Sequence, residues 1–253
     1  MKSNKLFVGA AAIAAAALAG AAQASVYDLK TDWSNASNPN GVWTYRQGVS
    51  ALPFVASWRP SDLNGVVQPA WAQGNTSGAF LPGFFQAVAA GSAMCATCDW
   101  QVGDILDHTT DQANGGGEGI ANVLFTSPSN GSADISGLVW NARSINRTQD
   151  WSLSINGTVV DSGVLLGDGT QGRLNPTVFN FSNVALAVGD QVVLSYIQDP
   201  RAPFGDLVGS NLDINLTPSG GVPEPATWAM MVVGFGGLGA VLRRRRGQVS
   251  LPA

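Results

Sequence analysis

The dipeptide Asn156-Gly157 constrains the fold of this chain more than any other feature of the sequence. It follows residues 151–155, in which apolar and polar side chains alternate, and it precedes a second strand-like run at residues 158–161. Alternation with a period of two puts the apolar side chains on one face of a strand, and Asn-Gly is the preferred dipeptide of a two-residue type I′ turn. These residues therefore predict a β-hairpin with one buried face.

Further strand-like runs are separated by turn signals such as Asn130-Gly131 and Gly189-Asp190. They lie at residues 121–125, 133–142, 177–181, 191–197 and 207–216. The region 60–119 is rich in Gly, Ala and Pro and is interpreted as strands joined by extended loops. No convincing amphipathic helix interrupts the pattern. We expect an all-β fold, a single jelly-roll β-sandwich over residues 25–218, which is long enough to enclose one core.

The charge of this central region is strongly negative. Residues 25–221 contain seven Lys or Arg and 16 Asp or Glu, a net charge of −9, whereas the whole chain has −4. A domain with this charge is repelled by phosphate backbones, so a nucleic-acid partner is not expected.

Residues 1–24 have the composition of a secretory signal peptide. Lys2 and Lys5 precede an Ala-rich apolar run, and Ala22-Gln23-Ala24 supplies small residues at both recognition positions for cleavage before Ser25. The alternative is an uncleaved membrane anchor, which the weakly apolar core and the clear cleavage site disfavour. Cleavage predicts an exported protein in an oxidising compartment.

Residues 219–253 are predicted to form a linker, a transmembrane helix and a basic cytoplasmic tail. The helix would run over residues 225–242, or roughly 27 Å at 1.5 Å per residue, close to the thickness of a hydrocarbon core. Pro225 suits its first turn, and Trp228 lies near the outer interface. The cluster Arg243, Arg244, Arg245 and Arg246 would hold the other end on the cytoplasmic side, so that the preceding domain faces outward.

The order Pro223-Glu224-Pro225, short apolar helix and basic cluster resembles the PEP-CTERM sorting domain, in the variant that continues with Trp228 and Ala229. The resemblance implies recognition of the proline motif by an exosortase-type membrane peptidase. It also implies transient anchoring in the inner membrane, followed by release to the cell surface or the extracellular matrix. An ordinary single-pass anchor would also predict membrane attachment, but it leaves the Pro-Glu-Pro motif unexplained.

A second resemblance covers most of residues 33–216. Asp32-Trp33-Ser34 and the segment 38–45, Asn-Pro-Asn-Gly-Val-Trp-Thr-Tyr, are similar to the opening of many bacterial exported jelly-roll domains. The later strands, the Asn-Gly hairpin and a Gly-Asp before the final strands follow in the same order. The group is similar to galactose-binding-type sandwiches and carbohydrate-binding modules, which implies a cell-surface polysaccharide as partner.

Candidate ligand-binding residues are four tryptophans in segments interpreted as loops or strand ends. Aromatic faces stack on the C–H groups of sugars, and neighbouring Asn, Asp or Arg side chains fix the orientation by hydrogen bonds. The alternative is that the rings belong to the sandwich core, which we favour for Trp140 and Trp151. The candidates are Trp43, Trp58, Trp71 and Trp100.

Cys95 and Cys98 form a Cys-Ala-Thr-Cys pair. Without a βαβ context a redox site is disfavoured, and two cysteines do not complete a four-ligand zinc site, so a local disulfide is predicted. His108 is the single histidine, and no nucleophile elbow or zinc-protease motif accompanies it. A catalytic role for His108 is therefore not expected.

Several acidic residues crowd one Gly-rich stretch. Asp104, Asp107 and Asp111, with Glu118 beyond them, could supply oxygen ligands to Ca²⁺, although the spacing matches no EF-hand. A solvated acidic loop is the favoured interpretation, and no other cofactor is expected.

The sequence as a whole predicts an exported surface or matrix protein that binds carbohydrate, including exopolysaccharide, without catalysis. A structural matrix or adhesin component with no small ligand is the alternative. A polysaccharide hydrolase, which would need two suitably placed carboxylates, is the less favoured third possibility.

Overall fold

The computed structural model describes residues 23–59, 66–74, 81–110, 120–199, 204–219 and 230–238, and Arg243. It divides into two compact units. The larger, Ala24–Ser219, contains all the strands named below, and the other is formed by Met1–Gln23 and Gly220–Ala253. Within the second unit, residues 230–238 are helical.

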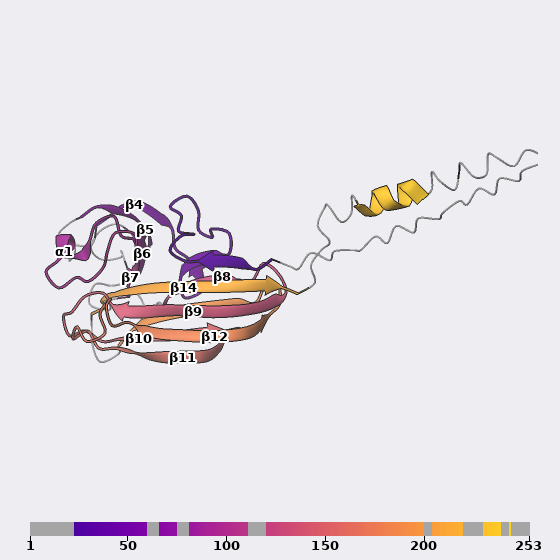
Figure 1. Ribbon diagram of the computed structural model, residues 1–253. Coiled ribbons are helices and arrows are strands. Elements are labelled where there is room, and N and C mark those ends of the chain that lie inside the picture. The colour runs from indigo at the N-terminus through magenta and orange to yellow at the C-terminus, as the bar shows by residue number, and fades with distance from the viewer. Residues whose placement is uncertain are drawn as a thin grey trace, which may run out of the picture. The chain divides into compact units, whose positions relative to one another are not determined.

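The larger unit is a sandwich of two antiparallel sheets (Figure 1), which confirms the predicted all-β jelly-roll class. The eight-stranded sheet has the order β12-β9-β14-β7-β6-β5-β4, with β1 also paired to β14, and the six-stranded sheet has the order β11-β10-β13-β8-β2-β3. The first strands are β1 (Ser25–Asp28), β2 (Trp43–Gln47), β3 (Ser50–Ala51), β4 (Phe54–Trp58), β5 (Gln68–Ala72), β6 (Gly83–Gln86) and β7 (Ile105–His108). The others are β8 (Ala121–Thr126), β9 (Gly131–Asn141), β10 (Gln149–Ile155), β11 (Thr158–Leu165), β12 (Thr177–Leu186), β13 (Gln191–Gln198) and β14 (Leu207–Pro218).

The predicted hairpin is confirmed as β10 and β11. Ile155 pairs with Thr158, and the intervening Asn156 and Gly157 both have positive φ, 50° and 79°. Positive φ at both central positions is what a type I′ turn requires, and Asn and Gly adopt it readily. The other predicted strands are present with bounds shifted by a few residues. The region 60–119, within its described part, adds β5, β6, β7 and one helical turn, α1 (Gly91–Met94).

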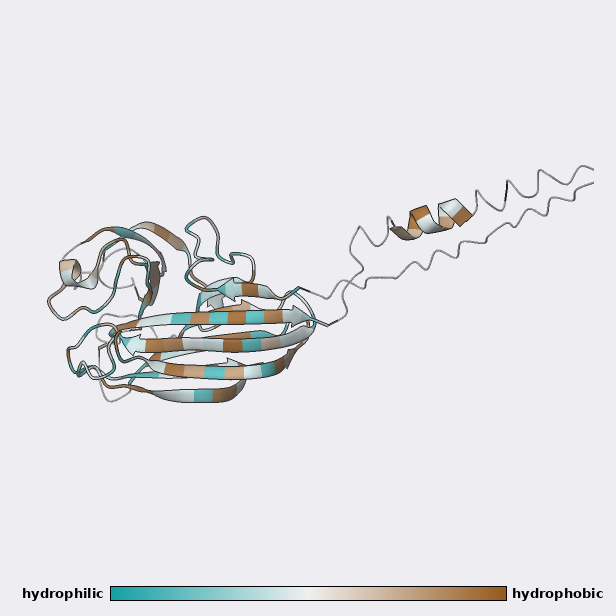
Figure 2. Ribbon diagram, viewed as in Figure 1, coloured by the Kyte–Doolittle hydropathy of each residue, from teal (hydrophilic) through white to brown (hydrophobic). Residues whose placement is uncertain are grey.

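The main core lies between the two sheets. β14 contributes Leu212, Ile214 and Leu216, whereas the residues that alternate with them point to the opposite face of the sheet. Figure 2 shows the same alternation of hydrophobic and hydrophilic residues along β14 and β9. The core-facing side of the eight-stranded sheet is called its inner face here, and the opposite side its outer face.

A second apolar cluster covers part of the outer face. It combines Leu207 and Trp140, at one end of β14 and β9, with residues of β4–β7 and α1. Its buried members are Trp58, Ala70, Ala72, Leu81, Phe85, Ala87, Met94, Trp100, Leu106, Trp140, Ala142 and Leu207.

The division of the outer face follows from the pairing of β14. One edge of this strand pairs with β9 along nearly its whole length. The other edge pairs with β7 over Leu207–Ser210 and with β1 over Asp213–Leu216. Because β7 carries β6, β5 and β4 beside it, the second cluster covers the first half of β14. In the half beside β1, the outer-face residues Asn211 and Asp213 are partly exposed and Asn215 is exposed, so this half is open among the described residues.

Candidate outer-face carbohydrate site

The open half of the outer face carries a row of four polar side chains. Asp28 of β1 pairs with Asp213 of β14, Asp213 pairs with Ser136 of β9, and Ser136 pairs with Asn180 of β12. Directly paired residues project to the same side of a sheet, so the four side chains form a line across the strands. Asn180 is exposed and the other three are partly exposed. These four residues are called the polar row below.

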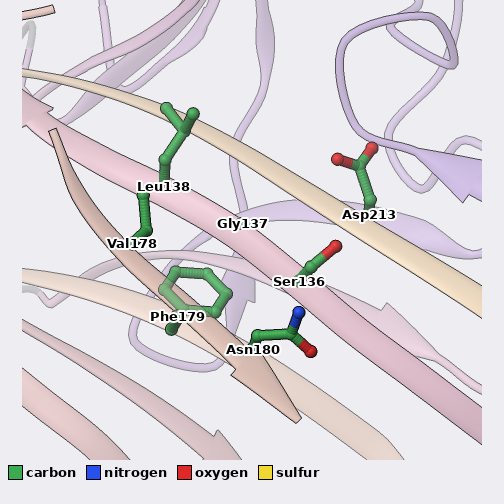
Figure 3. A pocket seen from close by; sticks show the side chains of 7 residues that line it. All are labelled: Ser136, Gly137, Leu138, Val178, Phe179, Asn180 and Asp213. Atoms are coloured by element: carbon green, nitrogen blue, oxygen red, sulfur yellow. The ribbon is translucent and has the colours of Figure 1, made fainter. Parts of the chain in front are cut away.

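An apolar row lies beside the polar row. Leu138 of β9 pairs with Val178 of β12, two residues along each strand from Ser136 and Asn180. Val178 is 69% exposed, and Leu138 packs against the second cluster. The apolar row and three members of the polar row line an open depression of about 420 Å³ (Figure 3), and Asp28 lies outside this lining. The lining residues are Ser136, Gly137, Leu138, Val178, Phe179, Asn180 and Asp213. This depression is called the outer-face site.

Gly137 forms the floor of the outer-face site. A Cβ atom built at this position would lie 2.4 Å from Cζ of Phe179 and 2.4 Å from the backbone oxygen of Asn211. Phe179 is 5% exposed and stacks on Trp151 in the main core, with ring centroids 5.8 Å apart. The absence of a side chain at 137 therefore lets the core pack directly beneath the site.

Asp28 and Asp213 form a carboxyl pair at one end of the polar row. Burial, followed by the charge of Asp28 and a hydrogen bond between the two carboxyl groups, raises the pKa of Asp213. The amide of Asn211 also donates to Asp213 Oδ2 at 3.1 Å. Asp28 is fixed by a turn, since its Oδ1 accepts from the backbone N–H groups of Lys30 and Thr31 at 2.7 and 2.9 Å. Asp28 is thus held in place beside Asp213.

Asp104, a candidate calcium ligand, is paired with two cations instead. Its carboxylate lies 2.9 Å from Lys30 Nζ and 2.7 Å from Arg173 Nε. Burial acts to raise the pKa of Asp104, but hydrogen bonds from Arg173, the Gln101 backbone N–H and Lys30 bring it below its usual value. This arrangement accounts for the charge of Asp104 without a metal ion.

The other candidate calcium ligands do not converge on Asp104. Asp107 is fully buried in β7, on the same strand face as Ile105 of the main core, and among the described residues neither of its carboxylate oxygens has a hydrogen-bond partner. Burial raises the pKa of Asp107 well above its ordinary value, and His108 opposes the rise. Asp111 and Glu118 lie outside the described residues. In the described part of the chain, no group of three His, Cys, Asp or Glu is placed to hold a metal ion.

All four candidate tryptophans are core residues. Trp43, Trp58, Trp71 and Trp100 are 1%, 0%, 4% and 3% exposed. Trp43 and Trp71 pack in the main core, and Trp58 and Trp100 in the second cluster. None presents a ring face to solvent in this structure, so the expected stacking platforms are not found there. Trp140 and Trp151, each 3% exposed, are core residues as predicted.

The remaining candidate residues are Cys95, Cys98 and His108. Cys95 and Cys98 are joined by a disulfide, with their Cα atoms 5.2 Å apart. His108 is buried, and its Nδ1 lies 3.0 Å from the backbone oxygen of Thr109.

Most of the predicted sorting residues lie outside the part of the chain that the structure describes. Pro223, Glu224, Pro225 and Trp228 lie there, as do Arg244, Arg245 and Arg246, and also residues 1–22 of the predicted signal peptide. Arg243 is described as helical. No helix in the described part of the chain has both the length and the apolar character that are needed to cross a membrane.

The residues of the outer-face site were not identified from the sequence. The alternation of Asn211, Asp213 and Asn215 with Leu212, Ile214 and Leu216 is visible there, and it marks one polar face of the last strand. Every strand of a sandwich has such a face, however. The pattern does not say which polar faces lie together or which remain uncovered.

Comparison with solved structures gives carbohydrate-binding modules at low similarity. The C-terminal family 6 module of a laminarinase from Zobellia galactanivorans is 15% identical, with a TM-score of 0.26 over 44% of this chain and 79% of that one. A family 36 module of a xylanase from the hindgut metagenome of Trinervitermes trinervoides is 15% identical, with a TM-score of 0.27 over 47% and 79%. A family 35 module from Clostridium thermocellum is 14% identical, with a TM-score of 0.28 over 52% and 88%. At these values the likeness carries no argument about a ligand.

The sequence comparisons concern the C-terminal segment. No curated protein matches the chain. The family model described as the PEP-CTERM protein-sorting motif matches residues 221–246. This range contains the Pro-Glu-Pro motif, the apolar segment and the arginine cluster in the order read from the sequence. The chain therefore carries a PEP-CTERM sorting motif at residues 221–246.

Proposed function

We propose that the exported domain binds carbohydrate at the outer-face site without catalysis, and that the C-terminal motif directs it to the cell surface or the matrix. The observation that carries the proposal is the pairing of the polar row with the apolar row. Sugars present hydroxyl groups beside patches of C–H, and side chains of Asp, Asn and Ser next to Leu and Val complement both. The partner would be a cell-surface polysaccharide, including exopolysaccharide.

The carboxyl pair favours binding over hydrolysis. Glycosidases place two carboxyl groups about 5–5.5 Å apart, or about 6.5–9.5 Å apart, on either side of the scissile bond. Asp28 and Asp213 instead lie side by side on neighbouring strands, at one end of the polar row. We therefore assign them to binding.

A binding assay on the full-length chain tests the site. The chain would be purified in a detergent without a sugar headgroup and applied to an array of bacterial polysaccharides. We expect binding at millimolar or tighter affinity, weakened at least about tenfold by Asn180→Leu. Ser195→Ala is the matched control, because Ser195 lies on the strand face turned away from the core-facing Leu194 and Tyr196 of the six-stranded sheet. Absence of binding to every glycan would overturn the proposal and leave the structural matrix role.

A separate assay tests the absence of catalysis. The polysaccharide retained best on the array would be incubated with the full-length chain, and new reducing ends would be measured. We expect none above the background of buffer. Release of reducing ends that is lost in Asp213→Asn would establish the hydrolase alternative.

Sorting is proposed to follow export by the Sec route. The segment 225–242 would hold the chain transiently in the inner membrane until an exosortase-type peptidase acts at Pro223, Glu224 and Pro225. Replacement of Glu224 by Gln should leave the uncleaved chain in the inner-membrane fraction. Its appearance at the cell surface with unchanged mass and yield would contradict this route.

A further inference from the structure

We infer that the outer-face site takes a neutral polysaccharide in an extended, β-linked conformation, with the chain axis crossing the strands along the polar row. This inference rests on the proposed function. It adds the charge, the shape and the direction of the ligand, which the proposed function leaves open.

The direction follows from the register. The polar row runs from β1 through β14 and β9 to β12, perpendicular to the strands, with one side chain from each strand. Neighbouring strands are about 4.8 Å apart, so three intervals span about 14 Å. In an extended β-1,4-linked glycan the sugars follow one another in a straight line, with a repeat of the same order as the spacing of the strands. Successive sugars would therefore meet successive strands, and three or four sugars would fill the row.

The two rows explain how such a chain would lie. Ser136 and Leu138 are two residues apart on β9, as are Asn180 and Val178 on β12, so the rows are separated by about 7 Å along the strands. A single flat sugar chain could therefore contact both rows at once. One edge of the chain would hydrogen-bond to the polar row while its C–H surface covers Val178 and Leu138. A helical α-linked chain curves away from a straight row and would reach fewer of these groups.

Ligands with carboxylates or sulfates would meet unfavourable charges at the outer-face site. The ionisable groups of the polar row are Asp28 and Asp213, and Asp134 lies on the same face, two residues from Ser136. Lys30 and Arg173 are each paired with Asp104. With the negative charge of the surrounding domain, an anionic chain would meet repulsion at the site. A neutral chain would meet hydrogen-bonding groups alone.

The site also predicts a dependence on chain length. Phe179 faces the core, so the labelled residues of the depression offer no exposed ring on which one sugar could stack (Figure 3). Affinity would then come from many individually weak hydrogen bonds, one or two at each strand. Short oligosaccharides would reach only part of the row.

The test compares three series of oligosaccharides by calorimetry, with the full-length chain in a detergent without a sugar headgroup. Cello-oligosaccharides, from the disaccharide to the hexasaccharide, are the neutral extended probe. Malto-oligosaccharides are the neutral curved probe, and oligomannuronates are the anionic extended probe. We expect affinity for the cello series to rise about tenfold or more up to the tetrasaccharide and then level off. The other two series should bind at least about tenfold more weakly at equal length.

Variants of the row show whether the length dependence arises there. Ser136→Val and Asn180→Leu should each lower the affinity for cellotetraose about tenfold and abolish the gain over the disaccharide. Ser195→Ala, on the other sheet, is the control and should leave the titration unchanged. Near-ultraviolet circular dichroism of each variant checks that the fold is retained.

The outcomes separate this inference from the proposed function. Binding of any glycan with no dependence on length, or equal binding of the malto or mannuronate series, overturns the inference while carbohydrate binding stands. Length-dependent binding that survives both row variants places the ligand elsewhere and also overturns it. Failure of every glycan, including the polysaccharides of the array, overturns the proposed function and the inference together.

Discussion

The indole ring of Trp140 covers the backbone of Gly209 on the outer face of the eight-stranded sheet. The two residues are paired between β9 and β14, and a Cβ atom at 209 would lie 2.0 Å from Cζ2 of Trp140. The indole Nε1 donates to the backbone oxygen of Asp99 at 2.9 Å. The contact marks where the second cluster ends and the open half of the face begins.

Gly209→Ala should therefore destabilise the domain. The added methyl group has no space unless the Trp140 ring moves, and overpacking of this kind costs about 1–3 kcal/mol. Chemical denaturation of the full-length chain would show a lower midpoint. Gly236→Ala is the control, because nothing lies within 4 Å of its Cβ position, and it should leave the midpoint unchanged. An unchanged midpoint for Gly209→Ala would contradict the close contact.

The buried tryptophans make a second prediction. Trp58→Ala and Trp71→Ala should each lower the free energy of unfolding by about 3–5 kcal/mol, because each removes a large core side chain. Val188→Ala, at a position 64% exposed, should change it by less than about 0.5 kcal/mol. If either tryptophan variant kept full stability and lost only glycan retention, the ring would be a binding platform after all.

Asp206 predicts a pH dependence of stability. Asp206 is fully buried, and burial is the largest cause of a rise in its pKa to about 6, opposed by hydrogen bonds from Leu207 N–H and Asn141 and by the charges of His108 and Arg143. The folded state holds this proton more tightly than the unfolded state does. Protonated Asp206 therefore contributes fully to the free energy of unfolding below about pH 4, and this contribution is lost as pH rises to about 6. The loss is on the order of 3 kcal/mol.

Unfolding free energies of the wild type and Asp206→Asn, measured in steps from pH 4 to pH 7, check this dependence. The variant should lack the part of the decline that Asp206 contributes, while any decline from Asp107 is common to both proteins. Parallel curves for the two proteins would show that Asp206 does not titrate in this window.

The disulfide predicts a small effect on stability. Cys95 and Cys98 close a very short loop, for which the chain-entropy argument gives at most about 2 kcal/mol. Cys95→Ser with Cys98→Ser should lower the free energy of unfolding by no more than this, and reductant should do the same to the wild type. A larger loss in the double variant than in the reduced protein would point to packing of the sulfur atoms instead.

Alternation and turn residues were sufficient to predict much of the fold. Asn156-Gly157 located the hairpin, and the runs at residues 133–142 and 207–216 became the two long neighbouring strands β9 and β14. The short strands between residues 54 and 108 were less visible, because their apolar residues pack on both faces. Phe84 belongs to the main core and Phe85 to the second cluster, so no simple alternation marks this region.

The candidate site could not be predicted in the same way. A tryptophan at a strand end has the same local sequence whether a second layer covers it or not, and Trp58 is buried because β4–β7 and α1 close around it. Asp104 and Asp107 are close in sequence, but their surroundings differ. Asp104 forms ion pairs with Lys30 and Arg173, whereas Asp107 is buried on the strand face that contributes Ile105 to the main core.

The sequence by itself determined the sorting motif, the strands and their turns, since each depends on residues that are near one another in the chain. Only the tertiary structure decided where a ligand could lie. β1 and β7 share one edge of β14, and in the described part of the chain the second cluster lies on the β7 side, so Asp28, Asp213, Ser136 and Asn180 line an open face. This arrangement depends on pairing between segments that lie up to nearly 200 residues apart in the sequence. The alternation of side chains along one strand contains no information about such pairing.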